Sequence, residues 1–317
     1  MQRFKKILAV LNGGPGSAEV ERRAVALARA NRAQLAFCTP KVGYPAAIPK
    51  FGSFHRELER LLETQRASIL DQAVESAARS GVEAHGRDLQ GKAFVSVIRE
   101  VLRDGHDIVL YPDDEPTSIQ NTLFGSTATH LLRKCPCPVW VIKPPGNDDG
   151  DRSVRRIVAA VNAVTENPTE QKLNRKILEL TTSLAEREAA EAHVVHCWSV
   201  YGESLLASRG RMTPDELHDY RTQTRRFHEE ALDGVLHRFV HEGRVIEPHL
   251  RKGDPGWEIP DLAAGLPADL VVMGTVARTG VNGVFIGNTA ESVLQRIRCS
   301  VLAVKPDGFA SPVTLDD

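Results

Sequence analysis

The sequence predicts an α/β protein of two similar domains, each with a five-stranded, mostly parallel sheet and helices on both faces. Short apolar runs rich in β-branched residues alternate with longer segments of helical periodicity, as in sheets built from strand–helix–strand units. The second half of the chain repeats the first half. With 317 residues the chain is also long enough for two domains of ordinary size.

The repeat is visible as pairs of similar segments at slowly growing offsets. The offset is 150 residues at the first strand and 162 residues at the last, so the second copy carries about a dozen extra residues. The matched segments are Lys6–Asn12 with Arg156–Asn162, Ala33–Cys38 with Ala192–Cys197, Asp107–Leu110 with Asp269–Val272, and Cys137–Lys143 with Cys299–Lys305. This pattern indicates a tandem duplication.

The apolar runs of the first copy predict its strands in order. They lie at Lys6–Leu11, Ala33–Cys38, a weaker run at Val82–Leu89, Asp107–Tyr111 and Pro138–Lys143. They lack strict alternation of apolar and polar residues, which is typical of strands buried on both faces. Leucine, isoleucine and valine recur at near-helical spacing from Leu58 to Val74, and a matching long segment runs from Glu216 to His241.

A polar stretch with glycine separates the two copies. Pro144-Pro-Gly is followed by Asn-Asp-Asp-Gly-Asp, which predicts a linker at residues 147–151. The first domain then covers residues 1–146 and the second covers residues 152–317.

Composition and charge limit the kinds of partner that this protein is expected to bind. The formal net charge is −1, and 42% of residues are hydrophobic and 26% charged, so no nucleic-acid or membrane partner is expected. No apolar run approaches the roughly 20 residues that span a bilayer. The five cysteines form an odd set in a chain with its own core, which favours free thiols and a cytoplasmic protein.

The loop GTVARTGVNGVFIGN after the strand ending at Met273 lies where ligands bind in open α/β sheets. It leads from Gly274 into a predicted helix at Ala290–Ile297. Asn288 followed by Glu291 has the spacing of a capping box, so we expect Asn288 at the N-cap. The loop is therefore the first candidate for an anion site.

The spacing of this loop, with the order of strands around it, resembles the universal stress protein family. Nucleotide-binding members carry G-x2-G-x9-G followed by Ser or Thr; here the positions hold Gly274, Ala277, Gly287 and Asn288, with Thr289 next. The family's adenine-contacting aspartate corresponds to Asn162. The resemblance covers both halves of the chain and implies two Rossmann-like, adenine nucleotide alpha hydrolase-like domains. It also implies ATP or a related nucleotide as the ligand of the second domain.

The first copy departs further from the family pattern. Counting back from Gly125-Ser126 places Pro112 and Glu115 at the two earlier glycine positions, and its first strand ends in Asn12. Proline removes a backbone donor, and the carboxylates nearby would repel a phosphate. We expect no nucleotide in the first half.

The resemblance also implies how the two domains associate. The last strands of paired domains lie antiparallel in the family, so Val139–Lys143 is expected to pair with Val301–Lys305 within one chain. This pairing would cover two sheet edges. A homodimer of the whole chain is a further alternative.

No catalytic constellation stands out in the sequence, so the leading interpretation is a non-enzymatic stress-response protein that binds a small ligand. A weak ATPase is the first alternative. The second is a scaffold or a binder of a hydrophobic ligand without a nucleotide site. The apolar loops Lys41–Ser53 and Trp198–Leu206 are expected either to act as lids over an apolar pocket or to pack against the partner domain.

Several smaller motifs favour plain structural interpretations. The run Asn12–Ser17 lacks the spacing of a phosphate loop and predicts a turn. His237 and His241 are four residues apart on a predicted helix, with His228 and His249 nearby, but without a glutamate between them they do not form a zinc-protease motif. We expect no metal site. On the strand Ala192–Cys197, His196 is expected to be a buried histidine with satisfied nitrogens rather than a cleft residue.

Overall fold

The computed structural model describes residues 4–41, 53–113, 124–144, 154–208, 212–240, 245–275 and 286–315. The chain divides into two compact units. Unit 1 comprises Met1–Arg152, Ala277–Ile286 and Ser300–Asp317, and unit 2 comprises Ser153–Val276 and Gly287–Cys299. The last strand of the second repeat therefore lies in unit 1. The linker predicted at residues 147–151 lies outside the described residues.

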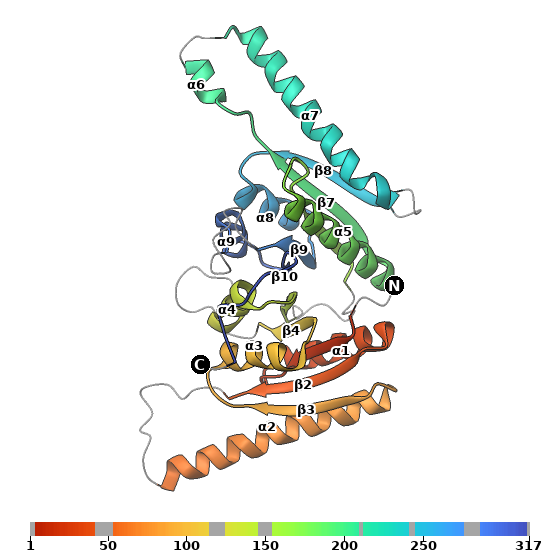
Figure 1. Cartoon of the computed structure of the whole chain (residues 1–317), viewed down its shortest axis with the longest axis vertical. Coiled ribbons are helices and arrows are strands. Elements are labelled where there is room, and N and C mark those ends of the chain that lie inside the picture. Colours follow the sequence, from red (N-terminus) through yellow and green to blue (C-terminus); the bar gives the residue numbers. More distant parts are fainter. Residues whose placement is uncertain are drawn as a thin grey trace. The chain divides into compact units, whose positions relative to one another are not determined.

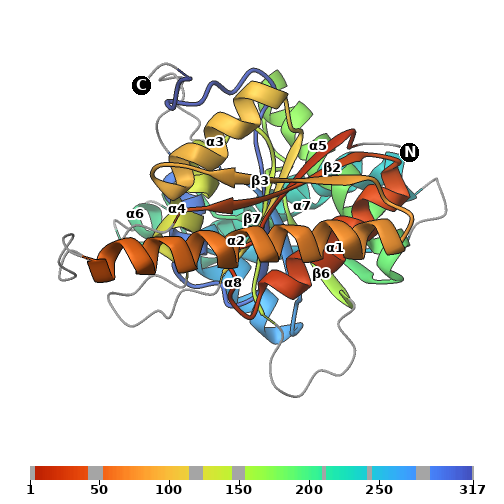
Figure 2. The ribbon, with the colours of Figure 1, turned by 90° about the horizontal axis from the view of Figure 1, so that it is seen from below.

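Unit 1 alternates strands and helices, as predicted. Its elements are β1 (Lys6–Val10), α1 (Ser17–Asn31), β2 (Gln34–Pro40), α2 (Ser53–Arg79), β3 (Ala84–Leu89), α3 (Ala93–Asp104), β4 (Ile108–Pro112), α4 (Ser126–Lys134), β5 (Val139–Ile142) and β10 (Ser300–Val304). The strands follow the order β3-β2-β1-β4-β5-β10, and β1 to β5 are parallel. Figure 2 shows α1 and α2 on one side of β2 and β3 and α3 on the other.

Unit 2 has the same plan. Its elements are β6 (Arg156–Ala160), α5 (Pro168–Glu188), β7 (Glu191–Trp198), α6 (Glu203–Ser208), α7 (Pro214–Val240), β8 (Ile246–Lys252), α8 (Pro255–Gly265), β9 (Leu270–Gly274) and α9 (Asn288–Leu294) (Figure 1). Its parallel strands follow the order β9-β6-β7-β8. Helices α5 and α7 contact each other and β7, and α8 contacts β7 and α9.

The predicted strands are buried on both faces, which explains their unbroken apolar character. In β1, all residues from Ile7 to Val10 are inaccessible to solvent, and in β9 the same holds from Leu270 to Val272. Side chains of such central strands pack against a helix layer on each side. The core of each unit therefore lies along its first and fourth strands.

Helix boundaries follow local capping chemistry. Asn167 precedes α5 and accepts a hydrogen bond from the Thr169 N–H, while Pro168 occupies the first helical position. Asp254 caps α8 in the same way through the Gly256 N–H. The extra residues of the second repeat appear partly here, because α5 has 21 residues and α1 has 15.

The predicted pairing of the last strands is confirmed. β10 lies antiparallel to β5, with Val301 opposite Val141 and Leu302 opposite Trp140. The Ser300 hydroxyl accepts a hydrogen bond from the Lys143 N–H at 3.2 Å. A strand of the second repeat thus covers the edge of the first repeat's sheet. Among the described residues, no helix has the length and apolar character required to cross a membrane.

Candidate functional site

The carboxyl ends of β6 and β9 meet at one edge of the unit 2 sheet. The strands are parallel, and Ala160 lies opposite Met273. The chain then continues past Ala160 to Asn162 and past Met273 to Gly274, so both predicted site residues lie at this edge. The carboxyl edge of a parallel sheet is where ligands bind in open α/β folds.

Gly274 is tightly enclosed by α5. A Cβ atom at this position would lie 2.7 Å from Leu173 Cδ2, well inside ordinary van der Waals contact. The absence of a side chain therefore lets α5 pack against the end of β9. This close packing is a structural reason for glycine here, independent of any ligand.

The loop after β9 returns to the same edge. The Gly287 N–H donates to the Thr275 carbonyl oxygen at 3.2 Å, and Thr275 is fully buried. This bond brings Gly287, Asn288 and Thr289 beside the end of β9. Ala277, the middle position of the predicted motif, lies outside the described residues.

The start of α9 corrects one expectation. Gly287 is the N-cap residue, with extended backbone angles, and its carbonyl accepts the first helical hydrogen bond from the Glu291 N–H at 2.9 Å. Asn288 is already helical, so the predicted Asn288 cap and capping box are wrong. The side chains of Asn288 and Thr289 are exposed instead. Their backbone N–H groups lie in the first helical turn, where no intrahelical acceptor exists.

Asn162 is held in place by two polar residues of α5. Its N–H donates to Asn174 Oδ1 at 3.2 Å, and Asn174 Nδ2 donates back to the Asn162 carbonyl at 2.6 Å. Its side-chain amide donates to Glu170 Oε2 at 3.1 Å, and the Thr165 hydroxyl donates to the same oxygen. An ionised carboxylate only accepts hydrogen bonds, so Glu170 fixes the NH2 side of the Asn162 amide. The amide oxygen, Oδ1, remains as the acceptor of this side chain.

His196 supports the same loop from β7. Its Nδ1 lies 3.3 Å from both the Ala163 N and the Val161 carbonyl oxygen, and its Nε2 lies 2.8 Å from His228 Nδ1 on α7. Either neutral tautomer satisfies both ring nitrogens. Burial lowers the pKa of His196 to about 4, so the ring is neutral at pH 7. This agrees with the expectation of a satisfied buried histidine.

At the equivalent edge of the first repeat, the carboxylate of Asp113 lies at the start of α4. Asp113 is buried and accepts a hydrogen bond from the Gly125 N–H at 3.0 Å, at the place where Thr275 accepts from Gly287 in the second repeat. Lys143 Nζ lies 3.9 Å from the other oxygen of Asp113. The protein thus places its own anion at this helix start. That no nucleotide binds in the first half stays a prediction. Glu115 lies outside the described residues.

The backbone N–H groups of the loop after β1 donate hydrogen bonds within the loop itself. Ser17 Oγ accepts from the N–H groups of Asn12 and Gly13, and Asn12 Oδ1 accepts from the Gly14 N–H and the Ser17 hydroxyl. Gly13 has a φ of +78°, which favours glycine. The sequence Asn12–Ser17 is therefore a turn, as predicted, rather than a phosphate loop.

Comparisons with known proteins agree with this architecture. A model of the Universal stress protein family matches residues 3–143 and 153–305. The chain is 36% identical over 228 residues to Universal stress protein E of Escherichia coli strain K12, with 71% of this chain and 69% of that protein covered. The chain belongs to the universal stress protein family. It is also 27% identical to Universal stress protein E of Photorhabdus laumondii over 322 residues, which cover 99% of this chain and 98% of that protein.

Solved structures show the same tandem fold. A putative universal stress protein from Pseudomonas aeruginosa UCBPP-PA14 matches with a TM-score of 0.66 and 22% identity, covering 97% of this chain and 95% of that chain. A universal stress protein from Archaeoglobus fulgidus matches with a TM-score of 0.61 and 14% identity, covering 95% and 98%. These matches show the α/β fold of two universal stress protein domains.

Sequence reasoning did not find the residues that orient the site of this universal stress protein. Glu170 and Asn174 are four residues apart on α5 and therefore share one helix face, which is the only local signal for them. Asp113, which directly follows β4, is one of the carboxylates that the sequence analysis expects to repel a phosphate in the first repeat. Of the two predicted lid loops, residues 42–52 lie outside the described residues. The other ends in α6, where Glu203 accepts from Arg221 and Lys252.

Proposed function

We propose that this universal stress protein is a non-enzymatic stress-response protein that binds ATP or a related adenine nucleotide at the carboxyl edge of β6 and β9. The observation that carries the proposal is the orientation of Asn162. Glu170 holds its NH2 group, so Oδ1 is the acceptor at the position of the family's adenine-contacting aspartate. An adenine amino group is a donor and requires such an acceptor.

The phosphates would lie at the start of α9. The backbone N–H groups of Asn288 and Thr289 are donors there, and the N-cap residue Gly287 has no side chain to block the start of the helix. Ala277 follows Gly274 in the connecting loop and adds one methyl group to the family's motif. The helix start and the oriented acceptor support retention of the site in the second repeat only, because the acceptor at the helix start is a backbone carbonyl there and the carboxylate of Asp113 in the first repeat.

The duplication provides a matched control for this proposal. Asn162→Ala removes the proposed adenine acceptor, and Asn12→Ala removes the equivalent asparagine of the first repeat. Calorimetric titration of the full chain with ATP and Mg²⁺ should give one site per chain. We expect Asn162→Ala to weaken it at least 10-fold, the effect of about 1.4 kcal/mol, while Asn12→Ala leaves the affinity within about 2-fold.

Two results would contradict the proposal. Absence of ATP binding by the wild-type chain would favour a scaffold or a hydrophobic ligand. Steady phosphate release that disappears with Gly287→Val would favour the weak ATPase instead. Circular dichroism of each variant separates loss of binding from loss of folding.

A further inference from the structure

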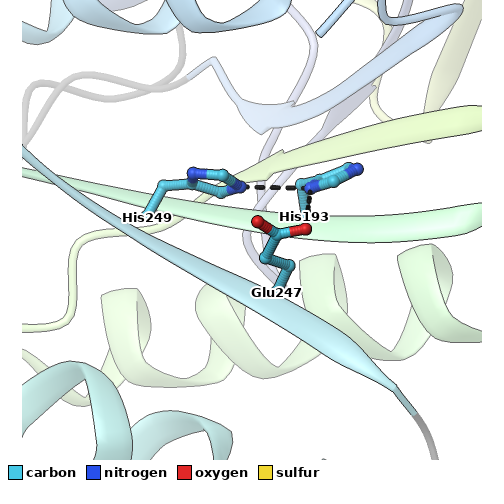
Figure 3. A group of neighbouring side chains, drawn as sticks. All are labelled: His193, Glu247 and His249. Carbon is cyan, nitrogen blue, oxygen red and sulfur yellow. Dashed lines mark hydrogen bonds and ion pairs between the residues drawn. The ribbon is translucent and has the colours of Figure 1, made fainter.

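A second polar cluster lies at the opposite edge of the unit 2 sheet, near the amino ends of β7 and β8. His193 lies on β7 opposite Glu247 on β8, and His249 follows two residues along β8. Side chains two residues apart on a strand point to the same face. Figure 3 shows that the three side chains converge between the two strands.

Two of the distances between ligand atoms in this cluster match those around a small tetrahedral cation. His193 Nδ1 lies 3.1 Å from His249 Nε2 and 3.4 Å from Glu247 Oε2. Zinc–nitrogen and zinc–oxygen bonds of about 2.0–2.1 Å give tetrahedral ligand–ligand distances of about 3.3–3.4 Å. All three ligand atoms lie within 4.8 Å of one another.

A second carboxylate lies near the other ring nitrogen of His193, without a hydrogen bond to it in this structure. His193 is buried, and its Nε2 lies 3.5 Å from Glu191 Oε2, which also accepts from Arg156 Nε at 2.9 Å. A metal-binding histidine commonly directs its other nitrogen to a carboxylate, which fixes the ring and raises its basicity. Here that arrangement would direct Nδ1 toward His249 and Glu247.

Solvent reaches the cluster through its carboxylate. The side chain of Glu247 is 64% exposed, while that of His193 is only 4% exposed. An ion could therefore enter beside Glu247 and reach the buried imidazole. Two imidazoles and one carboxylate form the ligand set of open zinc sites, in which a fourth position holds water or another ligand.

We propose that His193, Glu247 and His249 bind one Zn²⁺ ion per chain, with a fourth position open to solvent. The proposal does not rest on the nucleotide site, which lies at the other end of the strands. The proposed ligands also differ from the histidines that the sequence suggested, which were His237 and His241 with His249 nearby. No metal site was expected from those histidines. His237 lies on α7, and His241 lies outside the described residues.

A similar group in unit 1 shows what disfavours a metal. Glu100, Asp104 and His106 also have converging ligand atoms. However, Arg87 contacts Glu100 at 3.0 Å and Asp104 at 2.8 Å, and Arg103 contacts Glu100 at 2.9 Å. Two guanidinium groups already neutralise these carboxylates and would repel a cation. This group carries no proposal.

Zinc binding to the full chain tests the proposal directly. Protein freed of metal with a chelator is titrated with ZnCl2 by calorimetry, and bound zinc is counted by elemental analysis after dialysis. We expect one zinc per chain in the wild type and in the exposed-histidine control His237→Gln. We expect His249→Gln and Glu247→Gln to weaken binding at least 100-fold, and Glu191→Gln to weaken it about 10-fold.

Substitution with Co²⁺ identifies the ligands independently of affinity. A four-coordinate site of nitrogen and oxygen ligands gives intense visible bands without a thiolate charge-transfer band. A thiolate band, for instance from the half-exposed Cys197, would overturn the assignment. So would wild-type affinity in His249→Gln and Glu247→Gln, or no stoichiometric zinc in the wild type. Because Glu247 is exposed, Glu247→Gln is expected to fold normally. A loss of zinc binding in this variant therefore reports on the ligand and not on misfolding.

Discussion

Replacing Gly274 with alanine would test whether close packing against Leu173 of α5 is the reason for glycine at this position. The new Cβ would lie 2.7 Å from Leu173 Cδ2, whereas ordinary contacts begin at 3.4 Å, so the two carbons must separate by about 0.7 Å. Leu173 is half-buried and contributes only the end of its side chain, so it can move partly out of its rotamer. We expect Gly274→Ala to cost about 1–2 kcal/mol, within the usual range for overpacking.

A double-mutant cycle isolates this contact. Leu173→Ala removes the opposing methyl group, so alanine at position 274 should cost close to nothing in the double variant. For a domain of this size about 1 kcal/mol shifts the Tm by roughly 2–4 °C, which thermal unfolding followed by circular dichroism resolves. If Gly274→Ala has the wild-type Tm, or Leu173→Ala does not rescue it, packing against α5 is not the reason for this glycine.

Three further predictions concern charged and titratable groups. Asp113→Ala should lower the stability of unit 1 by about 1.5–3 kcal/mol, because the Gly125 N–H loses a charged acceptor; urea unfolding with an unchanged midpoint would contradict this. Asn162→Asp should destabilise the chain at pH 7 by about 1–2 kcal/mol, since a second carboxylate then faces Glu170 in a half-exposed site. Adding Glu170→Gln should restore stability. Equal Tm values for Asn162→Asp and the wild type would refute this repulsion. The pKa of His196 is about 4 in the folded state and near 6.5 in the unfolded state, so its contribution to stability is complete above pH 6.5 and is lost as the pH falls toward 4. The Tm of His196→Asn should therefore decline less steeply than that of the wild type across this window. Parallel Tm–pH curves for the two proteins would exclude the effect.

Most of the fold could be predicted from the sequence because its signals are local or repeated. The buried apolar runs mark the strands, and the two copies support each other. The similarity of the segments ending at Lys143 and Lys305 predicted that each is the last strand of its repeat, and the family resemblance predicted that the two strands pair, as β5 and β10 do. Family resemblance supplied the direction of this pairing, which no pattern within either strand encodes.

The details of the site depended on contacts between distant segments. Asn288 has the right residue type for a cap, but the bond from Gly287 to Thr275 sets where the helix begins, and that bond depends on the course of the whole loop. His193 and His249 are 56 residues apart, and only the register of β7 and β8 brings their rings together. Spacing along one helix pointed to His237 instead.

We propose above that the second repeat of this universal stress protein binds an adenine nucleotide. The most direct test is mass spectrometry of small molecules released by denaturing the freshly purified protein. Asn288→Asp serves as the control, because it places a carboxylate against the proposed phosphates at an exposed helix start where an acidic residue does not harm the helix. We expect an adenine nucleotide from the wild type and none from Asn288→Asp. Release of no nucleotide, or of an apolar molecule in its place, would contradict it.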